Sequence, residues 1–118
     1  MASTSPITSK SKAIKAFTFE SYGVLVKIES NHQEVVDKAE LVSTKALLGN
    51  LKPYEGAQFD HVFELPRDDS GVFHLIQNGE KISYGEDETI FFKFFDSILR
   101  VAIGEYATDR VFLHAGVV

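Results

Sequence analysis

The stretch GEDETIFFKFFDSILRVAIGEYATD, residues 85–109, decides the fold class because its apolar side chains repeat at helical spacing. One apolar line along the helix consists of Phe91, Phe95, Ile98 and Ala102. A second apolar set fills much of the remaining circumference: Phe92, Phe94, Leu99, Val101 and Ile103. A helix that is apolar on most of its surface is expected to be buried on more than one side. Acidic residues crowd its start, where the helix dipole favours negative charge. The stretch predicts a core helix over residues 90–106.

A second helix is predicted in SNHQEVVDKAELVSTKALLGN, residues 30–50. Asn31 followed by Glu34 approximates a capping box, in which the Asn side chain accepts a hydrogen bond from the first-turn amides. The apolar residues that follow have helical spacings: Val35, Ala39, Val42 and Ala46. Gly49 is expected to end the helix in the left-handed conformation that glycine tolerates. These features predict an amphipathic helix with one face on a sheet.

The remaining segments alternate apolar and polar residues, as strands do. On either side of Gly23, residues 17–20 and 24–29 predict one long or two consecutive strands, with Gly23 as a bulge or bend. Residues 51–58 are expected to be a loop. Further strands are predicted at residues 61–65, 72–77, 81–84 and 111–118, with a hairpin turn at Asn78–Gly79. The order predicts an α+β fold: a mixed, mainly antiparallel sheet of four to six strands packed with two helices.

The length of 118 residues predicts one domain. Residues 1–12, rich in Ser, Thr and Lys, are expected to form a disordered arm before a single domain at 13–118. Net charge −5 and a pI of about 5.3 argue against nucleic acid or anionic membrane as a partner. The chain has no cysteine, which removes disulfides and thiolate sites and fits a cytoplasmic location. No run of about 18 apolar residues predicts a membrane span.

Residue types that carry chemistry are scattered. Four histidines lack metal-ligand spacing, and structural roles are favoured for them: His32, His61, His74 and His114. His114 stays open, because an imidazole in an apolar strand must find polar partners. Asp68–Asp69 and residues 86–88 pair carboxylates, but turn and capping chemistry explain both clusters. No nucleophile elbow and no phosphate-binding glycine loop occurs. The sequence therefore predicts no catalytic residue, cofactor or metal.

An interaction role is the alternative reading of the phenylalanine-rich helix. If the helix is wider in apolar surface than the core needs, the spare face would form an exposed patch for a partner or a homodimer. The candidate interface residues are Phe91, Phe92, Phe94 and Phe95.

The segment DSILRVAIGEYATDRVFLHAGVV, residues 96–118, resembles the approach to the kinase core in HPr kinase-like proteins of bacteria. In that family an apolar helix leads into a strand with a Leu-His-Ala motif, which Leu113, His114 and Ala115 match. Gly116 and two valines follow the motif. FESYGVLVKIES, residues 19–30, also resembles the opening strand of the region that precedes the kinase domain in such proteins.

The resemblance implies that residues 111–118 are the first strand of a kinase domain, with the chain truncated before its phosphate-binding loop. The family's ATP-binding lysine and magnesium ligands would lie downstream. The chain would then be a non-catalytic accessory or regulatory domain, with the missing kinase-like domain or another protein as its partner. Two alternatives stay open: a free-standing binding or homodimerisation module, and a small enzyme that uses His74 or His114 with a nearby acid.

Overall fold

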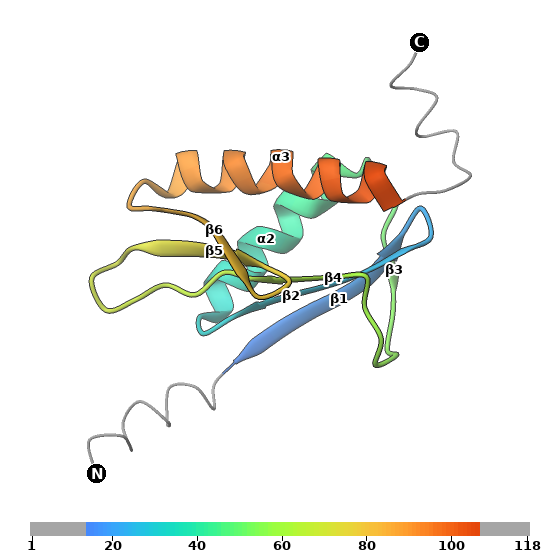
Figure 1. Cartoon of the computed structure of the whole chain (residues 1–118), viewed down its shortest axis with the longest axis horizontal. Coiled ribbons are helices and arrows are strands. Elements are labelled where there is room, and N and C mark those ends of the chain that lie inside the picture. Colours follow the sequence, from blue (N-terminus) through green and yellow to red (C-terminus); the bar gives the residue numbers. More distant parts are fainter. Residues whose placement is uncertain (1–13, 107–118) are drawn as a thin grey trace.

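A computed structural model of the chain describes residues 14–106 (Figure 1). The elements are β1 (Lys15–Ser21), β2 (Val24–Ser30), α2 (Gln33–Ala46), β3 (Lys52–Pro53), β4 (His61–Glu64), β5 (Phe73–Gln77), β6 (Glu80–Gly85) and α3 (Glu88–Tyr106). The predicted arm at 1–12 and the predicted strand at 111–118 lie outside the described residues. So does the motif of Leu113, His114 and Ala115.

The six strands form one mixed sheet in the order β3-β1-β2-β4-β5-β6. All neighbouring strands are antiparallel except β2 and β4, which run parallel with Val26 opposite His61. Two parallel strands need a crossover connection, because the chain must return to the same end of the sheet before the second strand begins. α2 is part of the connection from β2 to β4. The predicted α+β class, with a mainly antiparallel sheet and two helices, is confirmed.

Both helices cover the same face of the sheet (Figure 1). α2 packs against β1 and β2, α3 packs against β5 and β6, and the two helices contact each other. The core between the layers is rich in phenylalanine: Phe95 of α3 is fully buried and meets Phe63 of β4 edge to face, with ring centroids 5.6 Å apart. Aromatic pairs prefer this geometry over a parallel sandwich. The phenylalanine-rich helix is therefore the main core helix.

The turn between β1 and β2 corrects one prediction. Tyr22 and Gly23 both have positive φ, 51° and 83°, and they connect two fully paired antiparallel strands. Two consecutive left-handed residues define the turn that matches the twist of a two-residue hairpin. Gly23 is thus part of a tight reversal and not a bulge in a continuing strand. The other predicted hairpin, at Asn78–Gly79, is confirmed with φ of 52° and 87°.

The start of α2 also differs from the prediction. His32 occupies the N-cap position and makes no side-chain capping hydrogen bond. Asn31 lies one residue earlier and joins two chain segments, because its side chain accepts from the Arg67 amide and donates to the Arg67 carbonyl, both at 3.0 Å. The predicted capping residue therefore holds the connection after β4 in place. At the other end, Gly49 has the predicted left-handed φ, 77°.

Candidate binding groove

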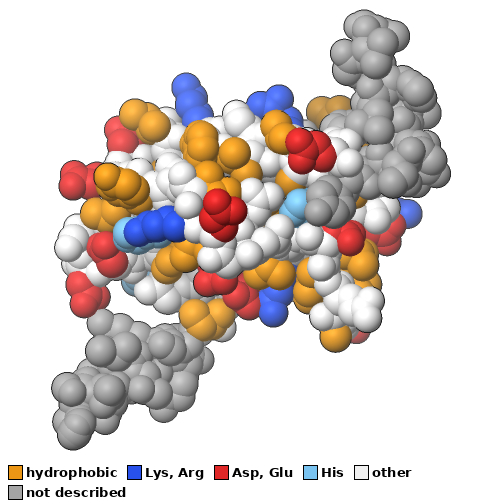
Figure 2. Space-filling view, viewed as in Figure 1, with side chains coloured by type: hydrophobic (Ala, Val, Ile, Leu, Met, Phe, Trp, Pro, Cys, Tyr) orange, Lys and Arg blue, Asp and Glu red, His pale blue; other side chains and the backbone are white. Residues whose placement is uncertain are grey.

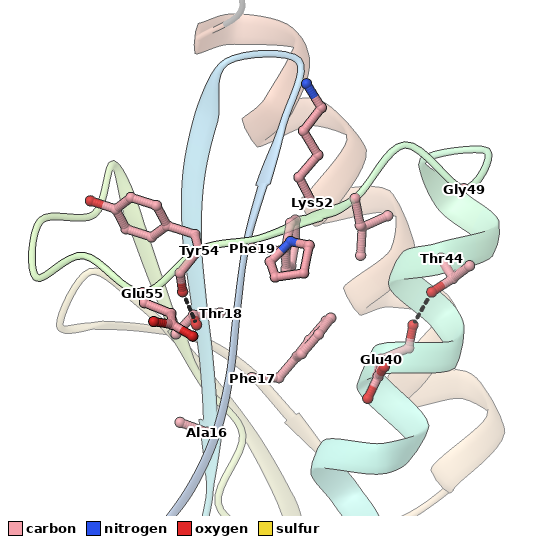
Figure 3. Close-up of a pocket in the computed structure, with 12 residues that line it drawn as sticks. Ala16, Phe17, Thr18, Phe19, Glu40, Thr44, Gly49, Lys52, Tyr54 and Glu55 are labelled. Atoms are coloured by element: carbon pink, nitrogen blue, oxygen red, sulfur yellow. Dashed lines mark hydrogen bonds between the residues drawn. The ribbon is translucent and has the colours of Figure 1, made fainter.

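A groove with a volume of about 470 Å³ lies at one edge of the sheet, between β1 and α2 (Figure 3). β1 forms one wall from Ala16 to Phe19, and α2 contributes Glu40 and Thr44 to the opposite wall. The Phe17 ring lies between the strand and the helix, with its centroid 5.2 Å from that of Phe19. The segment around β3 closes one end of the groove. The result is an elongated, partly apolar cavity that runs along a strand.

The strand that borders the groove has an open edge. β3 pairs with β1 only opposite Phe19 and Glu20. From Lys15 to Thr18, no strand of the described chain lies against this side of β1. An uncovered strand edge presents backbone N–H and C=O groups that can pair with another extended chain. The groove therefore combines a hydrogen-bonding edge with an apolar surface.

The chain that leaves β3 is held where it does not cover this edge. The Thr18 hydroxyl donates to the Tyr54 carbonyl at 2.6 Å, and the Tyr54 ring meets Phe59 edge to face at 5.5 Å. Further along, a carboxylate oxygen of Asp60 accepts from the Leu25 amide at 2.9 Å, and the Asp60 amide donates to the Leu25 carbonyl at 2.8 Å. Figure 3 shows Tyr54 on the far side of β1 from α2. These contacts keep the loop on the face of the sheet away from the helices.

The rim of the groove carries two carboxylates and one amine. Glu40 lies on the α2 wall and Glu55 lies beside β1, and in the described structure neither carboxylate forms an ion pair. Lys52 also lines the groove, but its amine points away from Phe17, toward the β1–β2 turn (Figure 3). The part of the groove beside Phe17 is thus bordered by negative charge.

The two threonine hydroxyls that line the groove are engaged with the backbone. Thr18 donates to the Tyr54 carbonyl, as above, and Thr44 donates to the Glu40 carbonyl at 2.8 Å within α2. No histidine lines the groove. A nucleophile needs a base within hydrogen-bond reach. The groove can therefore hold a ligand by backbone pairing, apolar contact and charge.

The four phenylalanines of the candidate interface separate into two groups. Phe91, Phe92 and Phe95 are 3%, 4% and 0% exposed and belong to the core. Phe94 alone is exposed, at 38%. The interpretation of this helix as a core helix is confirmed for three of the four phenylalanines, because their side chains are buried against other residues of the chain.

Phe94 lies on a stripe of α3 that also carries exposed Ile90 and Val101. The spacings of four and seven residues place the three side chains on one side of the helix. Figure 2 shows hydrophobic side chains over this part of the surface interspersed with charged ones, so they do not form one continuous patch. The stripe is the remaining candidate for contact between copies.

His74 and Asp68 form a histidine–carboxylate pair, with 3.0 Å from His74 Nε2 to an Asp68 carboxylate oxygen. The other Asp68 oxygen accepts from the amides of Ser70 and Val72, at 2.9 and 3.0 Å. The hydrogen bond from His74 is the main cause that lowers the pKa of Asp68. Neither His74 nor Asp68 lines the groove, and their contacts fit the predicted turn chemistry at Asp68.

His61 is a core residue and not a surface histidine. It is 3% exposed, lies on β4 and stacks on Phe63 with ring centroids 5.9 Å apart. Burial lowers the pKa of His61, because removing an imidazolium from water is unfavourable. His32, the N-cap residue of α2, has no contact with either of the other described histidines. In residues 14–106, no three potential metal ligands come together.

At the acidic start of α3, Asp87 accepts a hydrogen bond from the Ile90 amide at 3.0 Å, as an N-cap residue does. The predicted capping role of residues 86–88 is confirmed for Asp87. No helix of the described part of the chain is long and apolar enough to cross a membrane.

Comparison with known proteins found no counterpart: no protein-family model, no curated protein and no solved structure matches this chain. The resemblance to HPr kinase-like proteins therefore rests on the sequence segments at 19–30 and 96–118 alone.

Sequence reasoning missed the groove because its residues carry no motif. β3 has two residues, too few for an alternating pattern, and lies in the segment that was predicted to be a loop. One signal was present: Gly56 follows Tyr54 by two residues, and a Cβ at Gly56 would collide with the Tyr54 ring. A glycine close to an aromatic residue in the sequence can indicate that the ring packs on the glycine backbone. It does not indicate which strand the segment lies against.

Proposed function

We propose that this chain is a non-catalytic binding module, and that it serves in the cytoplasm as an N-terminal accessory or regulatory domain of an HPr kinase-like protein. The observation that carries the binding role is the groove: an open strand edge, an apolar surface beside it, and two threonine hydroxyls that are bonded to backbone carbonyls. The kinase association is supported by the match of Leu113, His114 and Ala115 to the family's strand motif. The partners would be the kinase-like domain itself or a protein that it acts on.

The accessory role is tested with magnesium and ATP. A ligand that binds only the folded state raises the melting temperature by an amount that grows with the ratio of its concentration to its dissociation constant. The full chain should show no rise in melting temperature in millimolar Mg-ATP, because it contains no phosphate-binding loop. A clear rise that keeps growing with the logarithm of the ATP concentration would overturn the proposal.

The kinase association has a separate test in the gene. The coding sequence beyond the codon for Val118 should continue within about thirty codons into a glycine-rich loop that ends in Gly-Lys-Ser or Gly-Lys-Thr. A stop codon at that point would overturn the association and favour the free-standing module.

The second candidate function is homodimerisation through α3. Exposed Ile90, Phe94 and Val101 favour it, because apolar side chains on one helical stripe are the usual anchors of helix-mediated contacts. Light scattering should then give a dimer mass for the natural chain and a monomer mass for Phe94→Glu. Lys93→Glu, on the same exposed helix surface, is the matched control. A natural chain that is monomeric at high concentration would exclude this function.

A further inference from the structure

The free edge of β1 and the wall of α2 together have the geometry of a strand-addition site. In strand addition, an extended peptide pairs with an open sheet edge through its backbone, and alternate side chains enter pockets on either side. β3 begins such a strand, opposite Phe19 and Glu20, and then leaves. No strand of the described structure pairs with β1 opposite Lys15–Phe17, directly in line with β3.

We propose that the groove binds an extended peptide segment of a partner protein, which adds to β1 beyond β3 and carries an aliphatic residue next to a basic one. This inference rests on the proposed binding function. It names the chemistry of the partner that the groove recognises.

The aliphatic residue follows from the position of Phe17. Successive side chains of a strand point to opposite faces of the sheet. Side chains on the helix side of an added strand would lie over Phe17, between β1 and α2 (Figure 3). Phe17 packs against the core cluster but stays partly exposed, so a leucine-sized side chain would cover apolar surface that water now contacts.

The basic residue of the peptide is inferred from the carboxylates beside the groove. The next side chain along the added strand would point to the other face, where Glu55 lies beside β1. Glu40 adds a second carboxylate on the α2 wall, and the amine of Lys52 points away from this part. A lysine or arginine in the peptide would be attracted by these two carboxylates, whereas an acidic residue at the same place would be repelled by them.

The edge strand at the opposite side of the sheet, β6, differs from β1 in the side chains that surround it. β6 is also an edge strand, but its exposed residues include Glu80, Lys81 and Tyr84, with both charges present. Charged side chains on an edge discourage pairing with other chains. Glu80 is therefore a matched control for Glu55: an exposed glutamate at the other end of the sheet.

The experiment is a fluorescence-anisotropy titration of the full chain with the fluorescein-labelled peptide Thr-Val-Thr-Leu-Lys-Val-Thr. The peptide should bind, and a version with both valines replaced by proline should not, because proline cannot donate to a strand ladder. Glu55→Lys should weaken binding roughly fivefold, and Glu80→Lys should leave it within about twofold, as expected for an exposed charge pair turned into a repulsion. A peptide with glutamate in place of lysine should prefer the Glu55→Lys chain. Circular dichroism confirms that both variants stay folded.

Three results would overturn the proposal: no binding of the lysine peptide, equal binding of the proline peptide, or equal weakening by Glu55→Lys and Glu80→Lys. A dimer whose dissociation accompanies peptide binding would also overturn it, because a second copy would then be the occupant. None of these results affects the Mg-ATP test. A chain that binds no peptide can still be an accessory domain, and a chain that binds ATP can still be titrated with the peptide.

Discussion

The two edges of the sheet expose the same backbone chemistry and are treated differently by the rest of the chain. β6 pairs with β5 across a register shift between Leu75 and Ile76, and its exposed residues are Glu80, Lys81 and Tyr84. β1 is covered by β3 over two residues only, and beside its open part lie α2 and the ring of Phe17. An irregular, charged edge resists pairing, whereas an edge beside an apolar groove invites it. Edge strands of one sheet can thus be assigned opposite roles from the side chains around them.

The largest expected effect is a loss of global stability, which unfolds both edges of the sheet together. Phe95→Ala deletes a fully buried ring that contacts Phe63 and Phe92, and large-to-small core changes of this type cost about 3–5 kcal/mol. Urea unfolding should therefore show a large loss of stability, with both edges exposed in one transition. Phe94→Ala, on the exposed side of the same helix, should cost below about 1 kcal/mol. Similar losses for the two variants would contradict the assignment of Phe95 to the core.

A smaller effect should destabilise the β6 edge first. Gly79 has φ of 87° in the β5–β6 turn, and an alanine in that conformation costs about 1–2 kcal/mol. Gly79→Ala should lower the free energy of unfolding by that amount and speed hydrogen exchange in β6 more than in β1.

Gly85→Ala is the control for that change. A Cβ at Gly79 or at Gly85 would meet no atom within 4 Å, and of the two only Gly79 has a positive φ. Any difference in stability between these variants thus reports backbone strain and not steric conflict. Equal stability would show that the turn relaxes.

A change at the centre of the sheet should affect both edges alike. The pKa of His61 is lowered from its ordinary 6.5 by burial, so as the pH falls the unfolded chain takes up a proton first. The stability that a neutral His61 contributes is therefore complete above pH 6.5 and is lost as the pH falls toward its folded pKa. The slope reaches at most about 1.4 kcal/mol per pH unit. Urea midpoints across this range should fall for the natural chain, and His61→Gln should flatten the dependence.

Asp68 titrates in a separate window. Its pKa is lowered from 3.8, so its contribution is complete above 3.8 and is lost only in stronger acid. A decline in stability that begins above pH 5 and persists in His61→Gln would contradict the assignment to His61.

The smallest expected effect concerns the β1 edge alone. Thr18→Val removes the hydrogen bond to the Tyr54 carbonyl and should cost about 1 kcal/mol. It should also release the loop after β3, which hydrogen exchange at residues 52–60 measures. Thr44→Val is the control, because its hydroxyl bonds within an exposed helix turn and its loss should cost a few tenths of a kcal/mol at most. Faster exchange in Thr44→Val than in Thr18→Val would contradict the role given to Thr18.

The sequence predicted the elements better than it predicted their junctions. Helical spacing in α3 and α2 and the Asn78–Gly79 turn depend on local chemistry, and all three were correct. Tyr22–Gly23 was misread because Gly23 alone is compatible with a bulge or a turn, and the choice depends on whether two equal strands fold back on each other. Asn31 was assigned to a cap, but its partner Arg67 lies 36 residues away, which no local pattern reveals.

The groove could not be predicted for the same reason. Its walls come from β1, α2 and the β3 segment, which the packing of α2 on β1 and the register of Phe19 with Pro53 bring together. The phenylalanine pattern identified the helix correctly but could not say which ring faces outward. That distinction requires the position of α2 and of the sheet, because apolar residues occupy both the buried and the exposed side of the helix.

The strand order has a consequence for how this domain can change over evolution. Strands from residues 15–53 occupy one half of the sheet and strands from residues 61–85 the other, joined by the parallel pair β2–β4. Every residue that lines the groove falls between Ala16 and Glu55. The lining of the groove is thus encoded by one continuous stretch of the gene. Substitutions in the second half can alter how firmly the domain is folded while the groove keeps its residues, so specificity and stability can drift separately.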